Sequence, residues 1–201
     1  DSPQLIRLAE IEPNKNQPRK YLDLQALQVL ADSIKENGVL QPLLVRPLLS
    51  GGYQIVAGER RWRASKMAGL TEVPVLIKEL SEREAMQLAL IENLQRENLN
   101  PIEEAKGYKD LIDSYGMSQD EVAKVVGKAR STVTNSLRLL TLPKLVRELL
   151  EKGEISAGHC KALMGISSPA EMTELALRAA DGELSVRSIE KLAQRKAKTE
   201  T

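Results

Sequence analysis

The sequence predicts an α/β domain over residues 1–100, followed by an all-α domain over residues 101–201 that contains a helix-turn-helix. Short apolar runs alternate with helical patterns in the first half, which is typical of α/β folds. After Asn100 and Pro101 the strand patterns end, and the rest of the chain consists of short amphipathic segments separated by glycine and proline. The 201 residues, 42% of them hydrophobic, are enough to bury a core in each domain.

The strands of the first domain are predicted from short runs of apolar or β-branched residues. These runs cover residues 5–8, 43–45, 53–56 and 73–77. Between the first two runs, residues 24–36 place apolar side chains at helical spacing. Asp23 is a favourable N-cap for this helix, and Gly38 stands where a C-terminal cap would end it.

Two further helices are predicted in the first domain. Residues 62–68 form a short helical segment that ends at Gly69. Ser81 and Glu84 have the spacing of a capping box, which predicts a longer helix that continues through Leu94. The N-terminal domain therefore alternates strands and helices.

The charge distribution points to duplex DNA, although the net charge is only +1. The segment from Val122 to Arg147 contains no acidic residue. A basic field without acids suits binding to phosphates. Phe is absent and aromatic residues make up 2% of the chain, which disfavours single-strand binding by base stacking. The basic residues of the segment are Lys124, Lys128, Arg130, Arg138, Lys144 and Arg147.

Other features limit the compartment and the chemistry. No apolar run reaches the roughly 18 residues that a membrane span needs, so we expect an intracellular protein without a membrane partner. Cys160 is the one cysteine and has no partner for a disulfide, which agrees with a reducing compartment. We expect it to be a small buried residue. The polar segment from Gln194 to Thr201 has no apolar face and is expected to be a frayed end or a linker.

Residues 118–140 have the pattern of a helix-turn-helix. Ser118, with Glu121 three residues later, begins the first helix, and Gly127 permits the sharp turn after it. The second helix is predicted over residues 132–140. Two amphipathic helices joined by a glycine turn also occur in proteins that never contact DNA, and it is the acid-free basic stretch that favours DNA binding here.

The second helix is the predicted recognition helix. Val133, Leu137 and Leu140 are expected to face inward, so that the opposite face shows hydrogen-bond donors without acids. Such a face fits a major groove, where Arg can read guanine and Asn can read adenine. The residues expected to contact DNA from this motif are Lys128, Arg130, Ser131, Thr132, Thr134, Asn135, Ser136, Arg138 and Thr141.

A second DNA contact is predicted from the segment that begins at Glu154. Gly158 permits a close approach of the backbone to DNA, and Lys161 supplies a cation. His159 is the single histidine, and the sequence provides no metal or triad partners for it. A structural or DNA-contacting role for His159 is therefore favoured over catalysis.

A phosphate site is predicted in the first domain at residues 58–64. This segment follows a strand and begins a helix, so its backbone amides and the helix dipole favour an anion. Arg60, Arg61 and Arg63 add positive charge. The segment lacks the Lys-Ser or Lys-Thr ending of a Walker A loop. The alternative interpretation is a solvated basic helix with Trp62 in the core.

Three other segments carry groups suited to a phosphate ligand. Residues 92–100 combine oxygen ligands for a hard cation with Arg96. Gln17 can orient a water and Arg19 can clamp a phosphate from a loop. Residues 38–42 offer Gly38 and Gln41, although their spacing alone does not distinguish them from an ordinary helix exit.

Taken together, these segments closely resemble the ParB family of chromosome-partitioning proteins. The blocks lie in the family's order across almost the whole chain, which makes the resemblance very specific. They are residues 17–19 (QPR), 38–46 (GVLQPLLVR), 55–64 (IVAGERRWRA), 91–96 (IENLQR) and 128–131 (KARS). The resemblance implies a ParB/sulfiredoxin-like N-terminal domain that binds CTP, followed by a domain that reads the centromere-like parS site.

The resemblance also implies roles for individual residues. Glu92 and Asn93 are expected at a Mg²⁺ ion, with Arg96 at the phosphates. Gln17 and Glu59 are expected to support a slow CTPase reaction that resets the protein. The residues expected to bind CTP are Arg19, Ser33, Gly38, Val39, Leu40, Gln41, Pro42, Gly58, Glu59, Arg60, Arg61, Glu92, Asn93 and Arg96.

The family's activity is that of a DNA clamp. Two chains associate, close on DNA when CTP binds, slide and later reopen, and a ParA-type ATPase is the partner of the full-length protein. The family's C-terminal dimerisation domain would lie beyond Thr201. We therefore expect a cytoplasmic, nucleoid-associated bacterial protein.

Two other functions fit the same motifs, and a third, an enzyme with a similar N-terminal fold, is disfavoured. A nucleoid-occlusion paralogue shares the scaffold but reads a different site, and a transcriptional regulator would bind DNA without nucleotide sensitivity. A sulfiredoxin-type reductase needs a cysteine in the phosphate loop, which this chain lacks. The positions that separate parS readers from occlusion proteins are Arg130, Ser136, Thr141 and Gly158, which are closer to the parS set.

Overall fold

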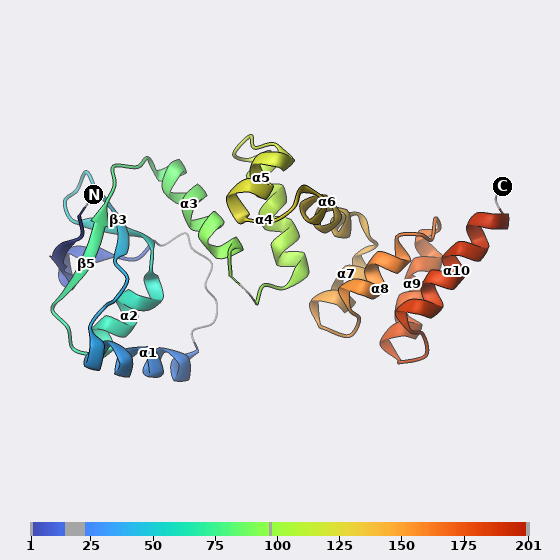
Figure 1. Cartoon of the computed structure of the whole chain (residues 1–201), viewed down its shortest axis with the longest axis horizontal. Helices are drawn as coiled ribbons and strands as arrows, with labels where there is room; N and C mark the ends of the chain where they lie inside the picture. The colour runs from blue at the N-terminus through green and yellow to red at the C-terminus, as the bar shows by residue number, and fades with distance from the viewer. Residues whose placement is uncertain (1, 15–22, 97, 200–201) are drawn as a thin grey trace. The chain divides into compact units, whose positions relative to one another are not determined.

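The computed structural model describes residues 2–14, 23–96 and 98–199. The chain divides into two compact units, residues 1–93 and residues 94–201 (Figure 1). The first unit is α/β and the second is helical, as the sequence predicts.

The described strands of the first unit form one mixed sheet. Their order is β1-β5-β3-β4-β2, with β3 parallel to β5 and antiparallel to β4. The four predicted strands are confirmed, whereas β2 is too short to show an alternating pattern in the sequence. The bounds are β1 Gln4–Arg7, β2 Ile11–Glu12, β3 Leu43–Pro47, β4 Tyr53–Ala57 and β5 Glu72–Ile77.

Two helices of the first unit begin and end at residues that the sequence singles out. In α1 (Leu24–Asn37), the Asp23 side chain accepts hydrogen bonds from two first-turn amides, and Gly38 ends the helix with φ 72°. In α3 (Glu82–Leu94), the Ser81 hydroxyl accepts from the Glu84 amide at 3.1 Å. Both predicted caps are confirmed.

The helix α2 (Glu59–Met67) begins directly after Gly58, as predicted for the phosphate segment over residues 58–64, and three residues before the helical segment predicted from Trp62. The reason is that Gly58 adopts a left-handed conformation directly after β4, which lets the helix start at the end of the strand. Trp62 is buried against the sheet core, and α1 packs on α2. The side chains at the interface of the two helices are Leu27, Ala31, Ile34, Ala64 and Ala68.

The second unit contains a large core beneath short helices. Its largest cluster of buried side chains includes Val146, Leu163 and Ile189. The helix α4 packs on α5 and α6, and its residues Tyr108 and Leu111 are fully buried. The bounds are α4 Pro101–Asp113, α5 Gln119–Val126, α6 Arg130–Arg138, α7 Lys144–Glu151, α8 Ala157–Leu163, α9 Pro169–Ala180 and α10 Val186–Thr199.

The predicted recognition helix is displaced toward the N-terminus. It spans Arg130–Arg138, not residues 132–140, and a 3₁₀ turn over Leu139–Thr141 follows it. Because the chain tightens in this turn, Leu139 is the buried residue and Leu140 is only partly covered. The inward direction of Val133 is confirmed.

The prediction of a frayed end after Gln194 is wrong for the part of the tail that the structure describes. The helix α10 continues through Thr199. It is held because Leu192 and Ala193 pack on the core of the unit and Lys196 pairs with Glu171 of α9. This partly apolar face is narrow, which is why the sequence pattern hides it.

Within the described residues, every helix is too short or too polar to cross a lipid bilayer.

Candidate functional site

The turn between β4 and α2 has the geometry of an anion-binding site. Gly58 has φ 104°, and a Cβ atom on it would lie 2.6 Å from Cδ2 of the buried Leu43. The first hydrogen bond within α2 joins the Trp62 amide to the Gly58 carbonyl at 3.0 Å. The amides of residues 59–61 precede that bond, as the free donors at a helix start do. They are the groups that bind anions at helix N-termini.

Arg61 ties this turn to the segment before β3. Its Nη1 atom donates to the carbonyl oxygens of Gln41 and Pro42, each at 2.7 Å. Burial lowers the pKa of the Arg61 guanidinium, and the charge of Glu92 opposes that shift. Part of the donor capacity of Arg61 is therefore already used by the protein itself.

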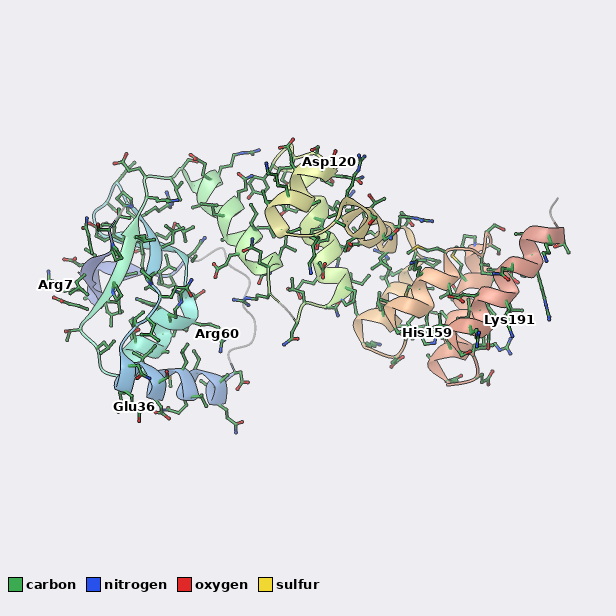
Figure 2. All side chains as sticks on the ribbon, in the orientation of Figure 1. Arg7, Glu36, Arg60, Asp120, His159 and Lys191 are labelled. Carbon is green, nitrogen blue, oxygen red and sulfur yellow. The ribbon has the colours of Figure 1, made fainter. Side chains whose placement is uncertain are left out.

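The other two arginines of α2 differ from Arg61 and from each other. Arg60 is exposed and, within the described residues, has no hydrogen bond or ion pair; Figure 2 shows its side chain extending from the helix. Arg63 donates to Oε1 of Glu59 at 2.9 Å, and only 10% of the Glu59 side chain is exposed. Arg60 is thus the arginine of this turn that is available to a ligand.

Glu92 lies on α3 within the electrostatic reach of Arg61. Burial raises the pKa of the Glu92 carboxyl, and the positive charge of Arg61 opposes the shift. The first unit therefore brings together the α2 turn, the Gln41 and Pro42 carbonyls and Glu92. Asn93 follows Glu92 in the same helix and is half-buried.

Not every predicted nucleotide residue falls into this group. Ser33 and Leu40 are exposed on α1 and after it, and Leu40 is 84% exposed. Arg96 is exposed and belongs to the second unit. Gln17 and Arg19 lie outside the described residues.

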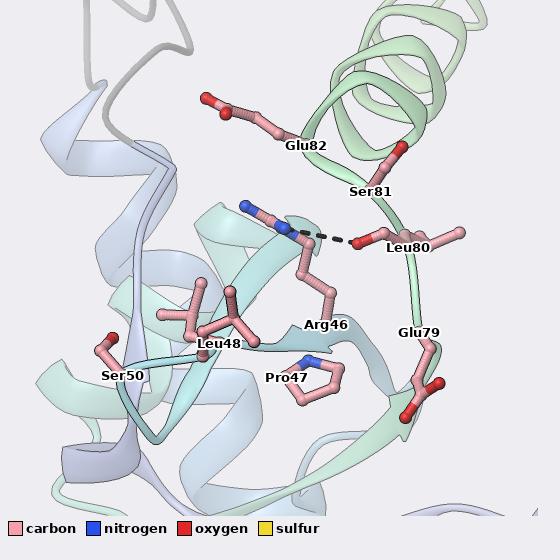
Figure 3. Close-up of a pocket in the computed structure, with 9 residues that line it drawn as sticks. Arg46, Pro47, Leu48, Ser50, Glu79, Leu80, Ser81 and Glu82 are labelled. Carbon is pink, nitrogen blue, oxygen red and sulfur yellow. Dashed lines mark hydrogen bonds between the residues drawn. The ribbon is translucent and has the colours of Figure 1, made fainter.

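A groove that the sequence did not indicate lies between the β3–β4 turn and the start of α3 (Figure 3). Arg46 donates to the Leu80 carbonyl at 3.3 Å and to Oε1 of Gln54 at 2.8 Å. The guanidinium of Arg46 thus fixes the segment that leads into α3. The nine lining residues contain none of the predicted nucleotide residues.

The helix-turn-helix of the second unit is built as the sequence predicts. The Ser118 hydroxyl accepts from the Glu121 amide at 3.1 Å and so begins α5. Gly127 ends α5 with φ 72° in the left-handed region. Val122, Val126 and Val133 are buried, and α5 packs on α6. The opposite face of α6 is therefore directed outward.

Two contacts on that outward face come from α5 and were not predicted. Arg130 Nη1 lies 3.4 Å from Oδ2 of Asp120, and the hydroxyl of Thr134 donates to Oε1 of Gln119 at 2.6 Å. Asn135 and Arg138 are exposed. The sequence signal for the first contact is that Asp120 stands just before the acid-free stretch.

The remaining predicted DNA residues on and around α6 are accessible. Ser136 is partly covered. The side chains classed as exposed are Lys128, Ser131, Thr132 and Thr141.

The predicted contacts from the segment before and within α8 share one helix start. The Ser156 hydroxyl accepts from the His159 amide at 3.2 Å, and the Ser156 amide donates to His159 Nδ1 at 3.0 Å. Because Nδ1 accepts, a neutral His159 ring carries its proton on Nε2. Gly158 and Lys161 are exposed on the same short helix. Figure 2 labels His159.

Cys160 is fully buried, as predicted. Burial raises the pKa of its thiol to about 11, so it is a structural residue.

Two protein-family models match consecutive parts of the chain. The ParB N-terminal domain matches residues 2–94, and the ParB HTH domain matches residues 97–198. The chromosome-partitioning protein Spo0J of Thermus thermophilus is 55% identical over 192 residues, 96% of this chain and 70% of that protein. The chromosome-partitioning protein ParB of Myxococcus xanthus is 51% identical over 189 residues, 94% of this chain and 64% of that protein. The chain spans about two thirds of the length of these relatives.

A solved structure is similar over nearly the same span. It is the C-terminally truncated chromosome-partitioning protein ParB from Caulobacter crescentus complexed to the centromeric parS site. The TM-score is 0.84 and the identity is 41%, over 96% of this chain and 99% of that chain.

Proposed function

The chain belongs to the ParB family of chromosome-partitioning proteins, and from this premise we propose that it binds parS DNA sequence-specifically and couples this binding to CTP. The observation that carries the proposal is the outward face of α6, which exposes Arg130, Asn135 and Arg138 on a helix without acids. Such a helix fits a major groove. The parS complex of the Caulobacter relative supports the same DNA partner for this chain.

The DNA contacts divide into two kinds. Arg130 and Asn135 suit base edges, because Arg pairs with guanine and Asn with adenine. Hydroxyl, ammonium, guanidinium and imidazole groups on and around α6 and α8, together with the backbone at Gly158, suit phosphates, which position the protein without reading sequence. The proposed phosphate contacts are Lys128, Ser131, Thr132, Thr134, Ser136, Arg138, Thr141, Gly158, His159 and Lys161.

The turn before α2 is the proposed site of the triphosphate. The donor set fits this group, because first-turn amides and the exposed Arg60 offer hydrogen bonds and charge. The absent side chain of Gly58 lets Leu43 and the Arg61 guanidinium pack closely against the turn. Arg61 would contribute charge while it fixes the segment of Gln41 and Pro42. The proposed pocket also includes Ser33, Gly38, Val39, Leu40 and Arg19. Cytosine as the base follows from the family resemblance.

Glu92 and Asn93 are the proposed ligands of Mg²⁺, with Arg96 at the phosphates. Carboxylate and amide oxygens are the donors that this hard cation prefers. When bound, the ion would neutralise charge on the phosphate oxygens. A cation beside Glu92 would also favour the ionised carboxylate, against which burial acts.

We propose slow hydrolysis of CTP. Glu59, one of the two proposed hydrolytic residues, is bound to Arg63 and largely shielded from solvent. A carboxylate fixed in this way can orient a group but is a weak general base at neutral pH. Gln17 is the other proposed residue. Turnover limited by positioning agrees with a switch that resets slowly.

The proposed cellular role is that of a clamp in chromosome segregation. Two chains would associate, close on DNA with CTP, slide away from parS and reopen after hydrolysis. A ParA-type ATPase would be the partner of the longer protein, in the bacterial cytoplasm at the nucleoid, without a membrane partner.

A titration panel tests the proposal. CTP, ATP, GTP and UTP are each titrated with Mg²⁺, with and without a parS duplex, and nucleotide binding is followed by calorimetry. Of the four nucleotides, we expect only CTP to bind. We expect it to bind more tightly when the parS duplex is present. Specific parS binding without any nucleotide effect would instead support a transcriptional regulator. Preference for a different duplex, with CTP sensitivity retained, would support a nucleoid-occlusion protein.

A further inference from the structure

The first turn of α5 contacts the outward face of the recognition helix twice. Oε1 of Gln119 accepts from the Thr134 hydroxyl at 2.6 Å, and Oδ2 of Asp120 lies 3.4 Å from Nη1 of Arg130. Arg130 and Thr134 are both proposed DNA contacts. The conformation of side chains that face the DNA is thus set partly by the preceding helix.

Asp120 and Glu121 are neighbouring acids with different partners. Both lie in the first turn of α5, where a negative charge stabilises the helix. The Glu121 carboxylate accepts from the Ser118 hydroxyl at 3.1 Å and so remains within its own helix start. The Asp120 carboxylate instead lies 3.4 Å from Nη1 of Arg130 on α6. Substitutions at the two residues can therefore distinguish a general effect of negative charge from a specific effect on Arg130.

The pair of Asp120 and Arg130 contributes little to folding. The side chains are 70% and 65% exposed, and ion pairs of this kind typically stabilise proteins by about 0–1 kcal/mol. Its effect is on the conformations of Arg130. Arg carries several donors in a rigid fork, so an acceptor at one nitrogen restricts the side chain while other donors stay open for a base.

The same carboxylate acts against nonspecific DNA. The Asp120 side chain is 70% exposed beside Arg130, a proposed DNA contact, so its charge would lie near phosphates, and repulsion from them would weaken binding to every sequence. On a cognate site this loss of affinity is offset, because an oriented Arg130 can form two hydrogen bonds to guanine. On other sequences nothing offsets it.

We propose that Asp120 is a specificity-determining residue, which orients Arg130 for base reading and penalises duplexes to which Arg130 offers only a phosphate contact. This inference rests on the proposed DNA-binding function of α6. Asp120 acts through Arg130 and is a positioning residue. Gln119 has the corresponding place beside Thr134.

The test measures the affinity of the full chain for a parS duplex and for a scrambled duplex of equal length, at several salt concentrations. Asp120→Asn is expected to strengthen scrambled binding more than parS binding, so that the ratio of the two affinities falls roughly three- to tenfold. Glu121→Gln, the matched control, is expected to change both affinities by the same factor, so that their ratio stays the same. Asp120→Glu, which keeps the negative charge, is expected to keep most of the affinity ratio of the parent protein. Thermal unfolding of each variant checks that the fold is kept.

The variant Arg130→Ala separates the two levels of the proposal. We expect it to lower the affinity ratio by itself, and Asp120→Asn to lower the ratio no further in that background. If Arg130→Ala lowers the ratio but Asp120→Asn behaves like Glu121→Gln, the positioning role is overturned while base reading stands. If Arg130→Ala weakens both duplexes equally, base reading by Arg130 fails and the role of Asp120 fails with it.

Discussion

The guanidinium of Arg61 donates to the carbonyl oxygen of Pro42 at 2.7 Å and so joins the start of α2 to the segment that enters β3. A second 2.7 Å bond from the same nitrogen reaches the carbonyl of Gln41. These two acceptors give Arg61 a part in the fold of the first unit that its neighbour Arg60 does not have. The two arginines should therefore be separable by experiment.

Arg60→Ala and Arg61→Ala are expected to differ in stability although both weaken CTP binding. Arg61→Ala removes hydrogen bonds from a charged donor to two carbonyls and should lower the free energy of unfolding by about 2 kcal/mol. Arg60→Ala should leave it within about 0.5 kcal/mol of the parent, because the side chain is exposed. Urea unfolding and CTP titration of both variants give the comparison. Equal stability of the two would show that the carbonyl contacts of Arg61 do not support the fold.

Gly58→Ala is expected to disrupt the turn before α2, the proposed phosphate site. The causes are a packing conflict and backbone strain. A Cβ atom at residue 58 would lie 2.6 Å from Cδ2 of the buried Leu43. Gly51→Ala is the matched control, because Gly51 has φ 95° but a Cβ atom there would have no heavy atom of the described residues within 4 Å, apart from its chain neighbours. The control should lose about 1–2 kcal/mol from the left-handed backbone alone.

The packing conflict should cost Gly58→Ala about 1–3 kcal/mol beyond the control. CTP binding should be lost in Gly58→Ala and kept in Gly51→Ala, as calorimetry can measure. If both variants lose the same stability and both still bind CTP, the close packing at the turn is not a requirement of the site.

Glu92→Gln is expected to alter the dependence of stability on pH. Burial raises the pKa of Glu92 in the folded state above its unfolded value, and Arg61 opposes the shift only in part. The folded state therefore binds this proton more tightly, so the contribution of Glu92 to stability falls as the pH rises from the unfolded pKa through the folded one. The glutamine side chain of the variant does not titrate, so the variant does not lose stability in this way as the pH rises.

The stability of Glu92→Gln relative to the parent should accordingly rise as the pH increases from the unfolded pKa of glutamate, about 4.3, toward neutrality. Thermal unfolding at three or more pH values across this range provides the measurement. A relative stability that falls with pH would mean that attraction to Arg61 outweighs the cost of burial.

Local signals in the sequence predicted much of this fold. Asp23 and Ser118 cap helices as expected, and Gly38 and Gly127 end them with a positive φ of 72°. Each of these features depends on a few neighbouring residues, which a single sequence displays. The start of α2 directly after β4 agrees with the prediction that residues 58–64 follow a strand and begin a helix, whereas the helical pattern alone indicated a helix only from Trp62.

The contacts that distinguish the site could not be predicted in the same way. Arg61 bonds to backbone carbonyls about twenty residues away, and any residue type supplies a carbonyl. The pairing of Asp120 with Arg130 depends on how α5 crosses α6. Both relationships arise from packing, which has no short-range pattern in the sequence. The composition of the stretch after Val122 nevertheless indicated which surface would carry positive charge.

Gly107→Ala should destabilise the second unit, although alanine favours helices. Gly107 lies inside α4, and a Cβ there would be 2.5 Å from Cδ2 of Leu94, a residue that is 3% exposed. The gain in helix propensity is about 1 kcal/mol, whereas forcing an extra methyl into a packed core costs about 1–3 kcal/mol. We therefore expect a net loss, measured by urea unfolding.

The sign of the effect should reverse when Leu94 is shortened. In a Leu94→Ala background the obstructing methyl groups are gone, so Gly107→Ala should raise stability through helix propensity and partial filling of the cavity. The double-mutant cycle then gives a coupling free energy between the two positions. A loss of stability in both backgrounds would place the conflict elsewhere than at Leu94. Additive effects with no coupling would mean that the end of α3 is not fixed to α4 through this contact.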